Sequence, residues 1–290
     1  MRNHISLFIL FLLPFSIIAQ DWSGGIRAGL NYSRIDGPSE LDLSGNSLER
    51  NTFSSGFHIG GMISRKLNSA VGLRGEILYT QRGTDYQYQG DSYFRFFTEG
   101  GAVASSRGTR FTTLRITNTY LDLPLSVFLR LGRIELSAGG YGSFMLSSRG
   151  VGELNYNGKS TVGQTIEPII VPLKYDYFKD QFQQTGVTNA KFITVDNRKV
   201  VVPATLGAYY DARDTGVPLF NRVDAGLHAG LGIFMSQGLY LGARIQQGLF
   251  DLTRAEQELS LHSLDAAGKI MPRSDKDQNL SIQLSIGFSF

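Results

Sequence analysis

Eight segments of the chain alternate apolar and polar residues with a period of two, and this pattern restricts the fold more than any other feature. A period of two places successive side chains on opposite faces, so each segment predicts a β-strand with one apolar face. In the fourth segment, leucine and valine occupy the odd positions from Leu121 to Leu131, while Asp122, Ser126 and Arg130 lie on the other face. The segments span residues 22–32, 53–66, 70–82, 114–131, 134–148, 223–235, 239–251 and 279–290.

The connections between these segments alternate in length without exception. Short links near "LNS", "GR" and "SQG" join segments two to three, four to five and six to seven. Short turns at one rim and long loops at the other are typical of a transmembrane barrel, whereas a soluble β-sandwich has no reason to sort its loops. We therefore predict an all-β fold, an eight-stranded antiparallel transmembrane β-barrel with three short periplasmic turns, four long extracellular loops and both termini periplasmic. The long loops would cover residues 33–52, 83–113, 149–222 and 252–278.

The predicted apolar faces carry almost no charge. A Lys or Arg that faces lipid at the midplane costs about 2–4 kcal/mol. The one charge on these faces is Arg65, which lies beside a short link where its long side chain can reach the membrane surface. Aromatic residues of the same parity mark the segment ends, as in the girdles at both membrane surfaces. These aromatic residues are Trp22, Tyr32, Phe53, Tyr79, Phe288 and Phe290.

The start of the chain predicts export. "MRNHISLFILFLLPFSIIAQ" has an early Arg2, an apolar run from Ile5 to Ile18 and a small residue at Ala19, the pattern of a secretory signal peptide. We assign residues 1–19 to the signal peptide and residues 20–290 to the barrel domain. The sequence has no cysteine, which excludes disulfides and thiolate metal sites. Its basic residues are scattered, so no nucleic-acid partner is expected.

The lumen face of the predicted barrel carries equal numbers of cations and anions. An eight-stranded barrel is just wide enough for side chains to fill, and buried charges persist when they are paired. We therefore predict an internal ion-pair network that closes the lumen. One pair follows from register, because a two-residue turn at "GR" places Arg130 opposite Glu135. The network residues are Arg27, Arg74, Glu76, Asp122, Arg130, Glu135, Asp224 and Arg244.

Catalysis and metal binding find little support. His58 and His228 have lumen parity, which favours hydrogen-bonded interior positions. His262 lies in the fourth long loop beside Ser260 and Ser263, near Glu256 and Glu258, yet adjacency along a loop defines no triad. Neither histidine pairs at ligand spacing nor an EF-hand pattern is present. We expect no enzyme activity, no catalytic residue, no metal and no cofactor.

The third long loop, residues 149–222, is the largest feature that the barrel does not explain. Loops longer than about 15 residues are usually functional or disordered, and this one is too rich in aromatic residues for a disordered linker. "KFITVDNRKVVVP" predicts a hairpin that turns at Asp196 and Asn197, and "YDYFKDQF" predicts a short helix. The loop would form either a self-packed cap or a docking surface. The docking candidates are Tyr175, Tyr177, Phe178, Phe182, Phe192, Tyr209 and Tyr210.

Three stretches resemble a known family. "YLDLPLSVFLRLG" at 120–132, "VDAGLHAGLGIF" at 223–234 and "GLFDL" at 248–252 are similar to strands of the PorT-like outer-membrane β-barrel family of Bacteroidota. Asp122 stands where that family usually has Glu. The resemblance implies an outer-membrane barrel and supplies no catalytic motif. The terminal Phe290 is similar to the aromatic C-terminus of bacterial outer-membrane barrels, which implies recognition by the barrel-insertion machinery.

The expected function is therefore non-catalytic. We expect an outer-membrane protein, surrounded by lipid, that acts as a binding or accessory component of secretion or envelope assembly. An envelope protein would bind to its extracellular loops. The alternatives are a narrow selective channel for small solutes and, third, an outer-leaflet lipid-modifying enzyme around His262.

Overall fold

A computed structural model describes residues 21–98, 101–182, 190–210, 212, 216–236, 238–265 and 268–290. The predicted signal peptide, residues 1–19, lies outside them. Within this part of the chain every regular element is a β-strand, which agrees with the all-β prediction. None of the described residues forms a helix long and apolar enough to cross a membrane.

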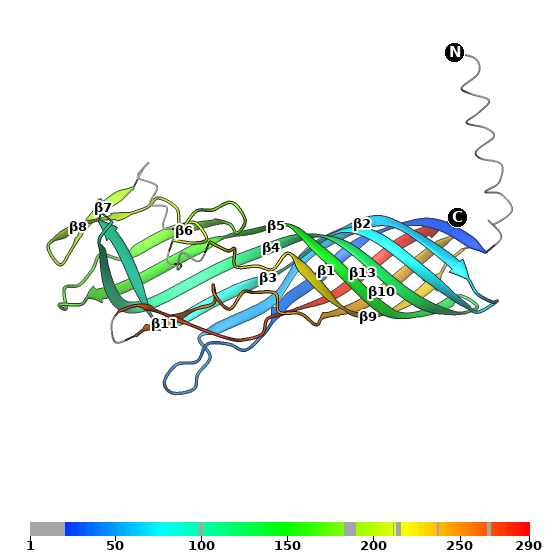
Figure 1. Cartoon of the computed structure of the whole chain (residues 1–290), viewed down its shortest axis with the longest axis horizontal. Coiled ribbons are helices and arrows are strands. Elements are labelled where there is room, and N and C mark those ends of the chain that lie inside the picture. Colours follow the sequence, from blue (N-terminus) through cyan, green and yellow to red (C-terminus); the bar gives the residue numbers. More distant parts are fainter. Residues whose placement is uncertain are drawn as a thin grey trace, which may run out of the picture.

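Thirteen strands follow one another along the described chain (Figure 1). Their bounds are β1 Trp22–Asp36, β2 Glu49–Lys66, β3 Val71–Thr98, β4 Val103–Leu131, β5 Ile134–Ser160, β6 Ile169–Asp176, β7 Lys191–Val195, β8 Arg198–Val202, β9 Val223–Phe234, β10 Leu239–Gly248, β11 Leu259–Leu264, β12 Ile270–Pro272 and β13 Gln278–Ser289.

Eight of these strands form a closed antiparallel ring. The order is β1–β2–β3–β4–β5–β9–β10–β13, and β13 pairs back onto β1. At the seam the Gly24 amide donates to the Phe290 carbonyl at 3.0 Å, and the Phe290 amide donates to the Gly24 carbonyl at 2.9 Å. The eight predicted segments are therefore the eight strands of the ring, and the last strand closes it as expected.

The short connections lie at the end of the ring where β13 finishes (Figure 1). β2 and β3, β4 and β5, and β9 and β10 are joined there by the links at 67–70, 132–133 and 235–238. Gly132 has a φ of 61°, a left-handed conformation that favours glycine in a two-residue turn. The "GR" turn therefore has the length and register that the sequence predicts.

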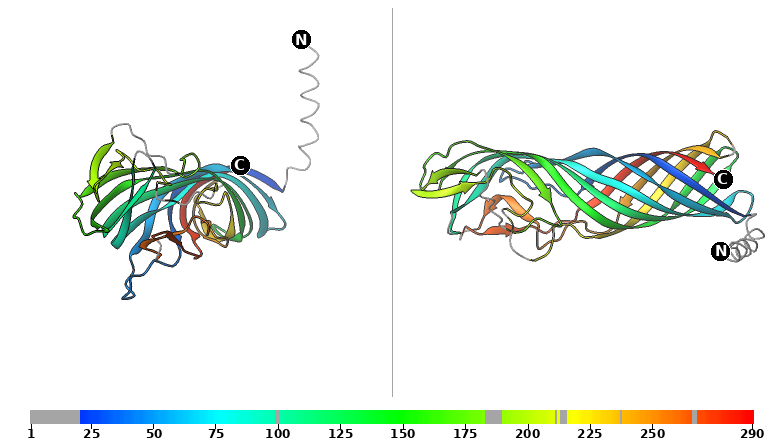
Figure 2. Two further views of the ribbon diagram at one scale, coloured as in Figure 1. Left: turned by 60° about the vertical axis from the view of Figure 1, so that its left-hand side comes forward. Right: turned by 90° about the horizontal axis from the view of Figure 1, so that it is seen from above.

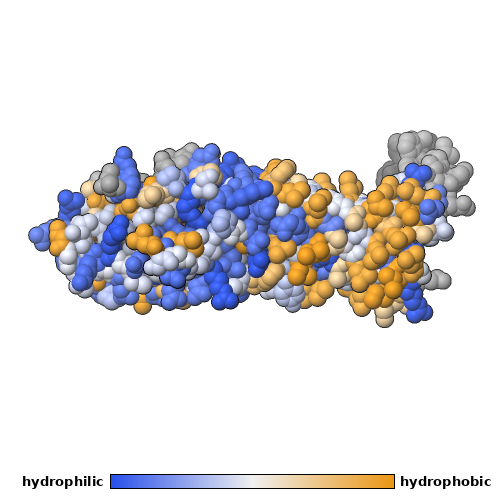
Figure 3. All heavy atoms as spheres, turned by 90° about the horizontal axis from the view of Figure 1, so that it is seen from below, coloured by the Kyte–Doolittle hydropathy of each residue, from blue (hydrophilic) through white to orange (hydrophobic). Residues whose placement is uncertain are grey.

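The outer face of the ring is apolar and exposed. Leu125 has 68% of its surface exposed, and the other large aliphatic residues of odd parity on β4 are exposed as well. Figure 3 shows apolar residues gathered over the half of the molecule that holds the ring. The Arg65 guanidinium lies 5.5 Å from the Trp22 ring centroid beside a short link, as expected for a charge at the membrane surface. A surface of this kind is favourable in contact with lipid.

The predicted loop at 83–113 is wrong, because most of it is strand. β3 has 28 residues, β4 has 29 and β5 has 27, whereas a tilted strand needs about 9–11 to cross a bilayer. The apolar alternation stops earlier than the strands because the outer face becomes polar beyond the membrane, as where Arg115 pairs with Asp85 at 2.7 Å. In addition, a bulge opposite Thr119 and Tyr120 reverses the inward parity of β5.

The extensions of β3, β4 and β5 support a second packed region, formed by the described residues of 83–113, 149–222 and 252–277 (Figures 1 and 2). We call it the extracellular body after the side of the membrane on which the sequence predicts it to lie. β6 pairs with β5, and the β7–β8 hairpin pairs with β3. That hairpin turns at Asp196 and Asn197, both with positive φ, as predicted. The helix predicted at "YDYFKDQF" is wrong, because Tyr175 belongs to β6 and a turn follows at 177–179.

A charge on the outer face of the ring should be costly only where that face meets lipid. We expect Leu125→Arg to lower the free energy of unfolding in lipid vesicles by about 2–4 kcal/mol. Thr113→Arg, on the outward face of the same strand within the extracellular body, is the control and should change it little. Urea titration in vesicles measures both. Equal costs for the two variants would contradict a lipid-facing Leu125.

Candidate functional site

Inside the ring, charged side chains meet at three levels. At the middle level Glu76 accepts hydrogen bonds from Arg27, at 3.0 Å, and from Arg244. Arg27 also donates to the Ser285 hydroxyl at 2.5 Å. His58 bonds Asn31 at 2.7 Å and Ser285 at 2.9 Å, an interior hydrogen-bonded position of the kind expected for it.

The level nearest the short turns centres on Glu135. Its carboxylate accepts from Arg74 at 2.6 Å and from Arg130 at 2.8 Å. Arg130 is the register partner of Glu135, so the predicted pair is confirmed. Arg74 comes from β3, and the sequence did not indicate that it would share this carboxylate.

The third level faces the extracellular body and centres on Arg82, which sequence reasoning missed. Arg82 donates to Asp122 at 2.6 Å and lies 3.9 Å from Asp224. Its guanidinium lies over Tyr120 and Tyr141, at 4.3 and 5.3 Å from the ring centroids. Arg82 has the same parity as Arg74 and Glu76, so the alternation would have predicted it to face the lumen if the third segment had not ended at this residue. All eight predicted lumen residues thus take part in this arrangement of levels.

The aromatic residues proposed for docking mostly face inward. The side chains of Tyr177, Tyr209 and Tyr210 are buried in the core of the extracellular body, which corrects their expected role on an exposed surface. Tyr175, Phe178 and Phe182 are partly buried against the same core. For Tyr175 one cause is that β6 pairs with β5, which fixes this residue in the sheet of the body.

One docking candidate remains at the surface. Phe192 on β7 is 39% exposed, and the Lys199 ammonium lies 4.1 Å from its ring centroid. Ile170 on β6 is 66% exposed although it belongs to the same body. These two residues are apolar positions on the outside of the extracellular body.

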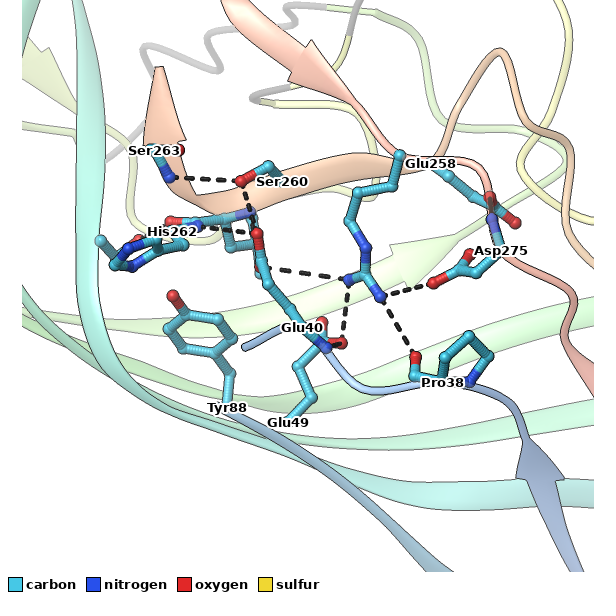
Figure 4. A network of polar contacts seen from close by, with 12 residues as sticks. Pro38, Glu40, Glu49, Tyr88, Glu258, Ser260, His262, Ser263 and Asp275 are labelled. Atoms are coloured by element: carbon cyan, nitrogen blue, oxygen red, sulfur yellow. Dashed lines mark hydrogen bonds and ion pairs between the residues drawn. The ribbon is translucent and has the colours of Figure 1, made fainter. Parts of the chain in front are cut away.

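The neighbourhood of His262 is organised by carboxylates (Figure 4). Glu40 accepts from the Ser260 hydroxyl at 2.5 Å and from the His262 amide at 3.3 Å. The His262 imidazole lies 3.2 Å from the Asp91 carbonyl, so its contact is with the backbone rather than with Ser260. This geometry joins no serine to the histidine as a nucleophile to its base.

A half-enclosed cavity of about 270 Å³ lies inside the extracellular body. Tyr93, Phe94, Tyr177 and Tyr209 contribute to its wall. One part of the lining carries Glu258, Asp275 and Asp277, whose carboxylate oxygens lie within 4.8 Å of one another. These three are the described residues best placed to hold a cation, and the sequence pattern did not single them out as a group.

Two of these carboxylates are held in an environment that disfavours their charge. Burial raises the pKa of Glu258 to about 7, and its hydrogen-bonded neighbour Asp275 adds to the effect. Burial, followed by the charges of Asp275 and Asp251, raises the pKa of Asp277 to about 6. Arg273 opposes the shift at Asp277.

Comparisons with known proteins bear on the fold. Residues 18–254 match the family model described as "Outer membrane protein beta-barrel domain", so the chain belongs to that family, and its location is the outer membrane. No curated protein matches the chain.

Solved structures of outer-membrane proteins are distantly similar. Ail of Yersinia pestis, solved with a heparin analogue, is 12% identical, with 93% of this chain and 100% of that chain covered and a TM-score of 0.34. OprG of Pseudomonas aeruginosa is 10% identical, with coverage of 93% and 96% and a TM-score of 0.33. The protease OmpT of Escherichia coli is 8% identical, with coverage of 93% and 96% and a TM-score of 0.31. Similarity at this level carries no argument about function.

The raised pKa values predict a pH-dependent extracellular body. Because both carboxyls bind protons more tightly when folded, stability is greatest at low pH and falls as pH rises from about 4 through 7. Amide hydrogen exchange in 251–277, corrected for intrinsic rates, should show an opening free energy lower at pH 8 than at pH 5 by on the order of 1 kcal/mol.

Glu258→Gln imitates the protonated acid and should remove most of this loss. Glu153→Gln, which removes an exposed carboxylate on β5, is the control and should keep it. If both variants lose the same opening free energy between pH 5 and pH 8, Glu258 is not the source of the pH dependence.

Proposed function

We propose that this outer-membrane protein is a non-catalytic binding or accessory component that works through its extracellular body. The observation that carries the proposal is the division of the chain into two parts. The ring has an interior occupied by ion-paired side chains, and β3, β4 and β5 continue from it into a body with its own aromatic core. A channel would need an open lumen. A protein that binds its partner through the extracellular body needs only a stable barrel to hold that body.

In this proposal the short turns and both chain ends lie in the periplasm and the body faces outward. The alternation of short and long links supports this orientation, because outer-membrane barrels keep their short turns on the periplasmic side. The resemblance of the strands to the PorT-like family is a further argument for this proposal. It fits a role beside other envelope proteins in secretion or envelope assembly.

The interior charges supply the first test. In planar bilayers we expect the intact chain to insert without unitary conductance, because ion-paired side chains at three levels occupy a lumen no wider than they are. Regular current steps whose size changes with Glu76→Gln would refute a closed barrel. They would favour the narrow selective channel instead.

The outer surface supplies the second test. Aromatic residues are favoured as anchors at protein interfaces, and Phe192 and Ile170 are exposed apolar positions on the body. Affinity isolation of the tagged chain from its native outer membrane should recover a stoichiometric protein partner, identified by mass spectrometry. The variant Phe192→Glu with Ile170→Glu should lose it.

Asn157→Glu is the control, because it adds one negative charge of the same kind at an exposed position of β5. Its partner should be recovered in full. If the intact chain is isolated alone in mild detergent, the accessory role loses its support.

A further inference from the structure

The cavity of the extracellular body has the features of a small-molecule site. Its volume of about 270 Å³ is near the lower end of the roughly 300–1,000 Å³ typical of ligand pockets. The wall brings together rings from β3, from β6 and the turn after it, and from the segment after β8. These rings include Tyr93, Phe94, Tyr175, Tyr177 and Tyr209. Such rings offer flat apolar surfaces on which an aromatic or alkyl group packs well.

The polar part of the lining contains a cation, Arg273, that already has anionic partners. Arg273 donates to Glu49 at 2.8 Å, to Asp275 at 2.5 Å and to the Pro38 carbonyl at 3.3 Å, and it lies 4.0 Å from Glu40. These four partners are labelled in Figure 4. Arg110, the other cation that the described lining contains, donates to the Tyr93 carbonyl at 2.8 Å. Arg273 therefore neutralises Glu49 and Asp275.

Glu258 and Asp277 have neutral partners instead. The Thr253 hydroxyl bonds Glu258 and lies 3.1 Å from Asp277, and the Asp275 amide donates to Glu258 at 3.2 Å. Within the described part of the chain neither carboxylate has an Arg, Lys or His at ion-pair distance. A buried carboxylate is costly without a counter-charge, so the cavity presents two anionic groups beside an apolar wall.

We propose that this cavity binds a small organic cation, a molecule with an aromatic or alkyl body and a primary ammonium group. The ammonium has three donors and would bond Glu258 and Asp277, while the body would pack against the tyrosine rings. An inorganic cation would use the carboxylates and leave the apolar wall without a role. The site is separate from the exposed Phe192 and Ile170, so this proposal and the proposed protein partner can fail independently.

Calorimetric titration of the full chain in lipid nanodiscs tests the proposal, with 4-phenylbutylamine as probe and empty nanodiscs subtracted. The neutral analogue 4-phenylbutanol has the same body without the charge. We expect the amine to bind roughly tenfold or more tightly than the alcohol, because charge-assisted hydrogen bonds to buried carboxylates are the stronger kind.

Variants assign the binding to the cavity. Asp277→Asn and Glu258→Gln keep the side-chain shape and should each weaken amine binding roughly tenfold, while the control Glu153→Gln should not change it. Ala208→Phe, which fills the cavity from its lining, should abolish binding of both probes. A rise in amine affinity from pH 5 to pH 8 should accompany these results, because Glu258 and Asp277 ionise in that range. The other charged groups around them are Arg273, Arg110, Glu49, Asp275 and Asp251.

Three results would overturn the proposal. Equal affinity for the amine and the alcohol would show that the carboxylates do not take part. No binding of the amine to the intact chain at millimolar concentration would exclude the site. Binding of Ca²⁺ at Glu258 and Asp277 without binding of the amine would make it an inorganic cation site.

Discussion

The pairing of β1 with β13 is the constraint on which the rest of the structure depends. In hydrocarbon an unpaired backbone amide or carbonyl costs several kcal/mol, so a sheet is tolerated there only when it has no edge. The seam runs over the whole of β13 and ends in the reciprocal bonds between Gly24 and Phe290. That register determines which side chains of β1 and β13 face inward.

The inward-facing parity of the strands brings charged side chains together inside the ring. Glu76, Glu135 and Asp122 each meet at least one arginine from another strand, so every level of charge ties two or three strands across the lumen. Pairs of this kind contribute little net stability, but loss of one partner costs about 3–5 kcal/mol. Their consequence is specificity, since a shift of one residue would separate these buried charges from their partners.

The ring could be predicted from the sequence because its signals are local or nearly so. Alternation marked the strands, and the two-residue turn at Gly132 determined the partner of Glu135. Arg82 escaped because the third segment was ended on it, although its parity matched. The sequence showed how many aromatic residues the body has, but not which of them face its core. Tyr177 is buried and Phe192 is exposed because of the strands that pack around each, and these are distant in the sequence. The cavity carboxylates escaped for the same reason, since no short-range pattern joins Glu258 to Asp277.

The continuity of β3, β4 and β5 has a mechanical consequence. These strands run from the short-turn end of the ring into the extracellular body without a linker, and at roughly 3.3 Å per residue β4 extends over about 95 Å. A hinge needs backbone that is free to rotate, and the antiparallel pairing of β4 with β3 and β5 continues on both sides of the bulge at Thr119 and Tyr120. The cavity and the outward surface therefore keep one orientation relative to the membrane plane. The protein therefore holds both at a fixed angle to the membrane and a fixed distance from it, unlike a domain on a flexible linker.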